Sequence, residues 1–273
     1  MDSARAFREL VRVSEPEIDL ARGALCIASI EHPRLRPERA LVELDALAER
    51  SGAAGLGDGL RILHRLREFL FGEEGFRGNA DDYYDPRNSC LNDVLDRHLG
   101  IPITLAIVVM EVGARVGLRI QGIGLPGHFV VGAELDTDSV LLDPFNGGAV
   151  LTRDGAHRVV ARAVGRAVKL TEESFLPCSR RQILARMLNN LKAVYVSRSE
   201  WAKALETIEC LLAVDPDSPA HRRDRGSVLV KLGQFHRGVA DWERYLTENL
   251  AAPDTEAVRQ QLRRVREGLA ALN

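Results

Sequence analysis

The 273-residue chain has few cysteines, and their spacing argues against the usual cysteine-based sites. The four cysteines are Cys26, Cys90, Cys178 and Cys210, and no two of them form a CxxC pair. Without such a pair, neither a structural zinc site nor a disulfide framework is predicted. Scattered thiols are typical of a reducing compartment. We therefore expect a cytoplasmic protein with no metal and no cofactor.

The chain also lacks a segment suited to a membrane. Its N-terminus has an early acidic residue, Asp2, and no apolar core of roughly 7–15 residues, so no signal peptide is predicted. The most apolar run, residues 100–118, is interrupted by Glu111 and Arg115 and is too short to cross a bilayer comfortably. We expect no membrane partner.

An excess of positive charge is missing as well. Lysine and arginine total 37, against 39 aspartates and glutamates, which gives a net charge of -2. Proteins that bind nucleic acid usually concentrate positive charge on one face. Arginines do cluster at residues 221–226 and 259–267, but on amphipathic helices such clusters are most often a solvated face. The charge pattern therefore disfavours a nucleic-acid partner.

Helical periodicity dominates the first 75 residues. Apolar residues recur at helical spacing in three segments, residues 16–33, 36–52 and 59–76. A proline ends the first segment and a glycine ends the second. Residues 1–75 are therefore interpreted as an N-terminal helical region.

Residues 76–178 have a different pattern. A long loop, two helices and three strands are predicted there, in this order: 77–89, 90–99, 103–116, 119–124, 128–134 and 139–143. The second helix is apolar nearly all round, as expected of a buried helix. Turn residues at 135–139 and 145–148 favour antiparallel strands. This region is predicted to be an α+β domain in which a buried helix lies beside an antiparallel sheet.

The last segment, residues 179–273, contains a repeat. Trp201 and Phe235 are 34 positions apart, and the same offset pairs Ala204 with Gly238. An aromatic residue followed by a small residue at this period is typical of tetratricopeptide repeats. The first helices of the two repeats are predicted at 188–198 and 223–232, and a capping helix at 254–273. Because two repeats are few for a free solenoid, we expect them to pack on the α+β domain.

Three chemically capable residues follow one another in the middle region. Cys90 begins a predicted helix, His128 enters a strand and Asp143 leaves one. A helix N-terminus favours a thiolate, and a histidine held by a carboxylate can serve as its base. Asn88 or Ser89 is a natural N-cap, which would put Cys90 in the first turn of its helix. The order therefore allows a thiol catalytic triad.

Each of these residues also has a purely structural interpretation. The negative charges of Asp93 and Asp96 disfavour a thiolate at Cys90, which also suits a small buried position at a helix start. His128 could hydrogen-bond a loop, and Asp143 could close an Asx-Pro turn. The residues alone leave both interpretations open.

Several segments together resemble one bacterial family. They are "NADDYYDPRNSCLNDVLDRHLGIPITLAIVVMEVGARVGLRIQGIGLPGHFVVG", "LLDPFNGGAVLTR", "RQILARMLNNLKAVY" and "RDRGSVLVKLGQF". Most of the chain is similar to proteins with a transglutaminase-like domain followed by tetratricopeptide repeats, whose members are often labelled as regulators of an invasion-gene regulator. The resemblance implies a papain-like cysteine-peptidase core of α+β class, preceded by helices and followed by the all-α repeat region.

The resemblance also implies where the site lies. In active members a cysteine begins the central buried helix, and the strands that carry the histidine and the aspartate follow it. Here the buried helix is predicted at 103–116, and its start, near Thr104, holds no cysteine. His128 and Asp143 match the family's histidine and aspartate, whereas Cys90 lies one helix too early. Thr104 is a poor substitute nucleophile, and we expect it to cap the helix.

The resulting site prediction has two parts. Cys90, His128 and Asp143 are the candidate catalytic residues. The pocket around them is expected to include Asn88, Thr104, Gly127 and Asn146.

Three hypotheses about function follow. The first is a transglutaminase-like protein that has lost thiol catalysis and binds or regulates a protein or peptide partner, through its degenerate pocket and the repeat groove. The second is an active cysteine peptidase or amidase that uses the Cys90–His128–Asp143 triad. The third, a regulator that acts through nucleic acid, rests only on the family label and the arginine clusters.

Overall fold

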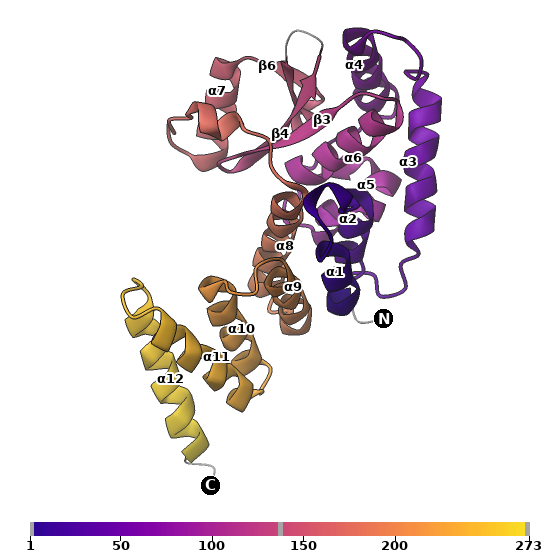
Figure 1. The fold of residues 1–273 in the computed structure, drawn as a ribbon. Helices are drawn as coiled ribbons and strands as arrows, with labels where there is room; N and C mark the ends of the chain where they lie inside the picture. The colour runs from indigo at the N-terminus through magenta and orange to yellow at the C-terminus, as the bar shows by residue number, and fades with distance from the viewer. Residues whose placement is uncertain (1–2, 136–138, 271–273) are drawn as a thin grey trace. The chain divides into compact units, whose positions relative to one another are not determined.

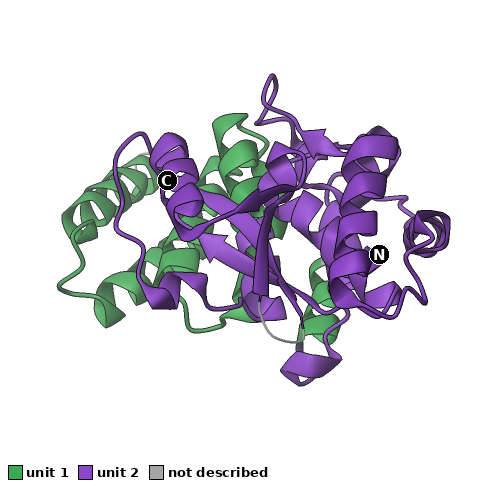
Figure 2. Ribbon diagram, turned by 90° about the horizontal axis from the view of Figure 1, so that it is seen from above, with its two compact units in different colours: residues 1–11, 188–273 green, residues 12–187 purple. Residues whose placement is uncertain are grey.

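The computed structural model describes residues 3–135 and 139–270 (Figure 1). The chain forms two compact units: residues 12–187 make one, and residues 1–11 join residues 188–273 in the other (Figure 2). The start of the chain thus belongs with its C-terminal region, whereas the sequence suggested three consecutive segments. Those segments, 1–75, 76–178 and 179–273, stay a prediction of domain boundaries.

The unit of residues 12–187 is rich in short elements. Its helices and strands are α2 (Leu20–Ala28), α3 (Pro37–Ser51), α4 (Gly59–Arg67), β1 (Arg77–Gly78), α5 (Leu91–Arg97), β2 (Leu99–Gly100), α6 (Pro102–Arg115), β3 (Ile120–Leu125), β4 (His128–Glu134), β5 (Ser139–Asp143), β6 (Ala149–Leu151) and α7 (Arg153–Val164). The helix α7 has no counterpart in the sequence prediction, although Ala156 and Val160 stand one helical turn apart in its sequence.

The N-terminal helices differ from the prediction at their ends. Asp19 accepts a hydrogen bond from the backbone N–H of Arg22 at 2.9 Å, so α2 begins at Leu20 and not near Pro16. The predicted helix over 59–76 divides in two, because α4 continues as a π-helical turn from Glu68 to Glu73.

The core of this unit is α6, which lies beside an antiparallel sheet with strand order β3-β4-β5-β6. The helix is buried along most of its length, as its all-round apolar sequence predicted, and it packs on β3 and β4. The helix α7 packs on the sheet through an apolar cluster that includes Ile123, Val130, Ala156 and Val160. The predicted α+β class is confirmed.

A tight turn brings the chain into β4 at His128. Leu125 pairs with His128, so Pro126 and Gly127 alone join β3 to β4. Gly127 has a φ of 67°, the left-handed conformation required at the third position of a type II turn. The turn predicted at 135–139 lies partly outside the described residues.

The second unit contains the helical repeats. Its helices are α1 (Ser3–Val11), the end of α8 (Arg180–Ser197), α9 (Trp201–Val214), α10 (Pro219–Lys231), α11 (Phe235–Glu248) and α12 (Thr255–Ala270). The helices α9 and α11 begin at the two aromatic residues that the repeat pattern aligned. The helix α1 packs on α9. The packing of the repeats on the α+β domain stays a prediction.

Small residues allow α10 and α11 to cross closely, as the repeat pattern predicted. A Cβ atom on Gly238 would lie 2.8 Å from the backbone oxygen of Gly226, and one on Gly226 would lie 2.7 Å from Cδ1 of Trp242. Trp242 in turn packs in one apolar cluster with Val258 and Leu262 of α12, which caps the repeats. Within the part of the chain that the structure describes, no helix has both the length and the apolar character needed to cross a membrane.

Candidate functional site

His128 and Asp143 meet at one end of the four-stranded sheet. His128 begins β4 and Asp143 ends the neighbouring strand β5. Val131 pairs with Leu142, so the next position of this register places Asp143 opposite Val130. His128 lies two residues before Val130 and is therefore the diagonal neighbour of Asp143 on the same face of the sheet. His128 Nε2 lies 2.9 Å from Asp143 Oδ2, and the side chains are only 6% and 0% exposed. The structure thus brings together the predicted histidine and aspartate.

Asp143 receives further hydrogen bonds from the turn that follows it. Its Oδ1 accepts from the backbone N–H groups of Phe145 at 3.1 Å and Asn146 at 3.3 Å, and its Oδ2 accepts from Asn146 Nδ2 at 2.7 Å. Burial acts to raise the pKa of this carboxyl, but His128 and Asn146 together outweigh burial and hold the pKa below its ordinary value. Asp143 is therefore a buried anion that orients His128 and also closes an Asx-Pro turn.

Arg186 fixes the turn that leads into His128, and the sequence prediction did not include it. Arg186 Nη2 donates to the backbone oxygens of Leu125 and His128, both at 2.6 Å. The guanidinium also lies over the ring of Phe129, 5.4 Å from its centroid. An arginine inside the otherwise apolar stretch "ILARML" was the available sequence signal.

Thr104 lies at the start of α6, where the family pattern implies a cysteine. The residue is fully buried. Its Oγ1 donates to the backbone oxygen of Asn88 at 2.6 Å and accepts from the backbone N–H of Ile101 at 3.2 Å. The hydroxyl hydrogen therefore points at a backbone carbonyl and not at a base. Ile101 is the N-cap of α6, and Thr104 caps the helix start from the third helical position by accepting the backbone N–H of Ile101.

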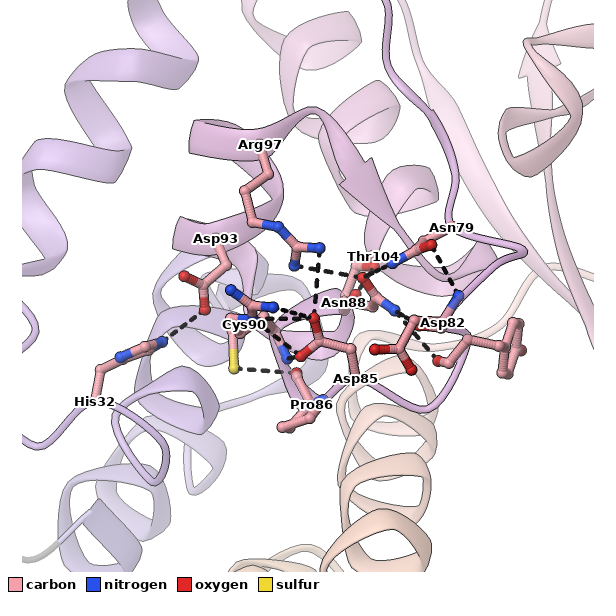
Figure 3. Close-up of polar contacts among 12 residues, drawn as sticks. His32, Asn79, Asp82, Asp85, Pro86, Asn88, Cys90, Asp93, Arg97 and Thr104 are labelled. Carbon is pink, nitrogen blue, oxygen red and sulfur yellow. Dashed lines mark hydrogen bonds and ion pairs between the residues drawn. The ribbon is translucent and has the colours of Figure 1, made fainter.

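Asn88 holds the predicted loop 77–89 against the start of α6. Its Nδ2 donates to the backbone oxygen of Asp82 at 2.6 Å, and its Oδ1 accepts from Asn79 Nδ2 at 3.1 Å (Figure 3). Its backbone oxygen takes the hydroxyl of Thr104. The polar atoms of Asn88 are thus used within the fold, which explains why this residue is fully buried.

The sequence predicted that Cys90 lies in the first turn of α5. In the structure, Cys90 is instead the N-cap of this helix. The residues Pro86–Ser89 form a 3₁₀ turn capped by Asp85, so the α-helix begins only at Leu91. The Cys90 thiol donates to the backbone oxygen of Pro86 at 3.4 Å, and the residue has 0% exposure. The sulfur is held against the backbone and has no surface that a substrate could reach.

The histidine and the carboxylate beside Cys90 are His32 and Asp93 (Figure 3). One side-chain atom from each of the three residues lies within 4.8 Å of the other two. His32 Nε2 is 2.6 Å from Asp93 Oδ2. From the sequence, Asp93 was predicted only to disfavour a thiolate by its charge, and His32, which follows α2 in the N-terminal region, was not predicted to be near Cys90. No short-range spacing could have linked His32 to Cys90.

A pocket of 350 Å³ opens in the repeat unit between α8, α9 and α10. Its lining residues are Lys192, Ala193, Val196, Trp201, Ile208, Asp224, Ser227, Val228 and Lys231. Lys192 Nζ lies 2.6 Å from Asp224 Oδ2, and Lys231 Nζ lies 5.9 Å from the centroid of the Trp201 ring. We name this surface the repeat pocket. It combines apolar walls with two lysines and one aspartate.

Together, the fold and these sites define the class of protein. The unit of residues 12–187 holds a buried histidine–aspartate pair and has a threonine at the start of its central helix. The model of the transglutaminase-like superfamily matches residues 38–189, and a tetratricopeptide-repeat model matches residues 191–263. The chain belongs to the transglutaminase-like superfamily and carries tetratricopeptide repeats after that domain.

Relatives of similar length identify the group more narrowly. A UPF0162 protein of Xylella fastidiosa is 33% identical over 261 residues, which cover 94% of this chain and 93% of the relative. A UPF0162 protein of Pseudomonas aeruginosa is 29% identical over 95% of this chain and 94% of its own length. One from Vibrio cholerae is 27% identical over 90% and 92%. No solved structure gives a significant match.

Proposed function

We propose that this protein has no thiol catalysis and binds a protein or peptide partner through the repeat pocket, with the surface around His128 and Asp143 as a second recognition region. The observation that carries the proposal is Thr104. It occupies the start of the central helix, where a nucleophile is required, and its hydroxyl donates to the backbone of Asn88. A threonine in this arrangement caps a helix and does not attack a substrate.

The alternative is a cysteine peptidase or amidase that uses Cys90 with His128 and Asp143. A catalytic thiol must face its histidine and a substrate. Cys90 instead donates to Pro86 and has His32 and Asp93 as neighbours, with no exposed surface. The contacts of Cys90 therefore favour the noncatalytic proposal.

The chemistry of the repeat pocket supports a peptide ligand. Val196, Trp201 and Ile208 provide apolar contact area, and a volume of 350 Å³ suits one or two side chains. Lys192 and Lys231 exceed the single carboxylate of Asp224 by one positive charge. The pocket thus suits a peptide that pairs an apolar side chain with a carboxylate.

The arginine clusters give little support to a nucleic-acid partner, because carboxylates pair with most of their arginines. Ion pairs in the repeat unit join Arg222 to Glu248, Arg223 to Asp254, Arg225 to Asp241, Arg263 to Glu256 and Arg266 to Glu243. Phosphate binding would have to displace these partners.

A peptide array probed with the full-length chain tests the proposal. The array should hold ten-residue peptides in which an apolar residue and a carboxylate are placed at varied spacing. We expect binding that Trp201→Ala and Lys231→Glu each weaken at least tenfold. Lys169→Glu, an exposed lysine outside the pocket, is the matched control and should bind as the wild type does. Equal binding by the wild type and both pocket variants would refute the pocket as the recognition site.

A further inference from the structure

We propose that His32, Cys90 and Asp93 form a binding site for one zinc ion. The three side chains converge from two elements: Cys90 and Asp93 come from the start of α5, and His32 comes from the segment after α2 (Figure 3). Their nitrogen, sulfur and oxygen atoms all lie within 4.8 Å of one another. Imidazole, thiolate and carboxylate are the three ligand types that zinc takes from proteins.

The arrangement of the three groups favours a metal over a nucleophilic triad. In a triad, the carboxylate and the thiol contact opposite nitrogens of the imidazole. Here the edge of the His32 ring that carries Nε2 faces both the Asp93 carboxylate and the Cys90 sulfur (Figure 3). Three donor atoms that point at one volume can share an ion. They cannot relay a proton from the thiol through the ring to the carboxylate.

The ion needs only a small rearrangement. In a tetrahedral site with zinc–ligand distances of about 2.0–2.3 Å, neighbouring ligand atoms lie about 3.3–3.6 Å apart. The His32 Nε2 to Asp93 Oδ2 distance of 2.6 Å must therefore open, while the sulfur moves inward and leaves the carbonyl of Pro86. Binding releases the thiol proton to solvent, and the proton on a neutral His32 ring moves to Nδ1, so that Nε2 can bind the ion.

An entry route lies on the His32 side of the site. The side chains of His32 and Asp93 are 34% and 16% exposed. His32 also lines a groove of 820 Å³ between α5 and residues 31–43. Asn92 lines the same groove, and its Oδ1 is buried without a hydrogen-bond partner among the described residues. Three protein ligands leave a fourth zinc position open, and the groove can supply water or a bound ligand to it.

The expectation that the chain holds no metal rested on sequence spacing alone. The absence of a CxxC pair excludes sites built from neighbouring cysteines. It does not exclude a metal site in which a cysteine and an aspartate on one helix turn are joined by a histidine that is distant in sequence. This inference is independent of the proposed peptide binding, because all of its residues lie in the unit of residues 12–187.

Metal titration of the full-length protein tests the site. The chelator-treated protein is loaded with Zn²⁺ and its metal content is measured by mass spectrometry, with Co²⁺ as a spectroscopic probe. We expect one equivalent of zinc. The cobalt form should show a thiolate-to-cobalt charge-transfer band in the near ultraviolet. His32→Ala, Asp93→Asn and Cys90→Ser should each lower zinc affinity by at least about 100-fold, beyond the 10–100-fold effect of losing an outer-shell group.

Two control variants make the test specific. His64→Ala removes an exposed histidine that also pairs with a carboxylate, Glu68, and Cys26→Ser removes another thiol of the same unit. Both should bind zinc as the wild type does. His32→Ala changes a partly exposed side chain, and Asp93→Asn replaces the carboxylate with a side chain of the same size. Circular dichroism should therefore show that both variants are folded. The proposal is overturned if the wild type binds less than about 0.2 equivalents, or if folded His32→Ala retains wild-type affinity.

Discussion

The substitution Asp143→Asn tests how much the buried histidine–aspartate pair contributes to the fold. Asparagine keeps the size of the side chain and can still accept from the backbone N–H groups of Phe145 and Asn146. It loses the charge that faces His128 and the acceptor for the Asn146 side chain. Breaking a buried pair costs about 3–5 kcal/mol, and the retained backbone bonds reduce this, so we expect a loss of about 2–4 kcal/mol at pH 7.

The pH dependence of this loss follows from the lowered pKa of Asp143. A carboxyl whose pKa is lower in the folded state stabilises the protein above its unfolded pKa of about 3.9, and the stabilisation disappears as the pH falls through the folded value. The difference between wild type and Asp143→Asn should therefore shrink as the pH falls below about pH 4.

Urea denaturation followed by circular dichroism measures the difference, and hydrogen exchange of residues 122–146 locates it. Asp81→Asn, at an exposed loop position, is the control and should change stability by less than about 0.5 kcal/mol. The reasoning fails if Asp143→Asn is as stable as Asp81→Asn at pH 7. It also fails if the difference does not shrink below about pH 4.

Three further substitutions test other elements. Thr104→Val should lower the free energy of unfolding by about 1–2 kcal/mol because it removes the α6 cap, and Thr104→Ser should recover most of this loss in urea denaturation. Equal stability of the two variants would refute the cap. Gly226→Ala should destabilise the repeat unit by about 1–3 kcal/mol, because the new Cβ atom meets Trp242. The control Gly268→Ala places its Cβ atom where nothing lies within 4 Å, so it should not destabilise the unit. Unfolding of this unit is followed by tryptophan emission, and equal effects of the two variants would contradict the close crossing of α10 and α11. Arg186→Ala should speed hydrogen exchange at the turn before His128, and Arg186→Lys should speed it less. Unchanged exchange in Arg186→Ala would contradict the role of Arg186 in fixing this turn.

Periodic patterns in the sequence predicted several of the main helices. The all-round apolar stretch gave α6, and the aromatic residues 34 positions apart mark the starts of α9 and α11. Helix ends were less predictable, because they depend on single capping contacts. Asp19 sets the start of α2, and the 3₁₀ turn before Cys90 moves this residue from the first turn of α5 to its N-cap.

The candidate site residues also differ in how well the sequence could predict their contacts. His128 and Asp143 lie at ends of adjacent strands joined by short connections, so the order of the strands was enough to suggest their contact. Cys90 could not be placed by such reasoning. Its neighbour His32 is distant in sequence and reaches it only because the segment after α2 packs beside α5. Long-range packing of this kind leaves no periodic signal in one sequence.

The most direct test of the central claim compares binding and turnover in one experiment. A peptide that binds the full-length protein on the array is titrated by fluorescence polarisation, and the same mixture is analysed by mass spectrometry after prolonged incubation. We predict that the wild type and Cys90→Ser bind it with the same affinity, that Trp201→Ala binds at least tenfold more weakly, and that every sample returns the peptide intact. Cleavage or modification of the peptide by the wild type but not by Cys90→Ser would contradict the account.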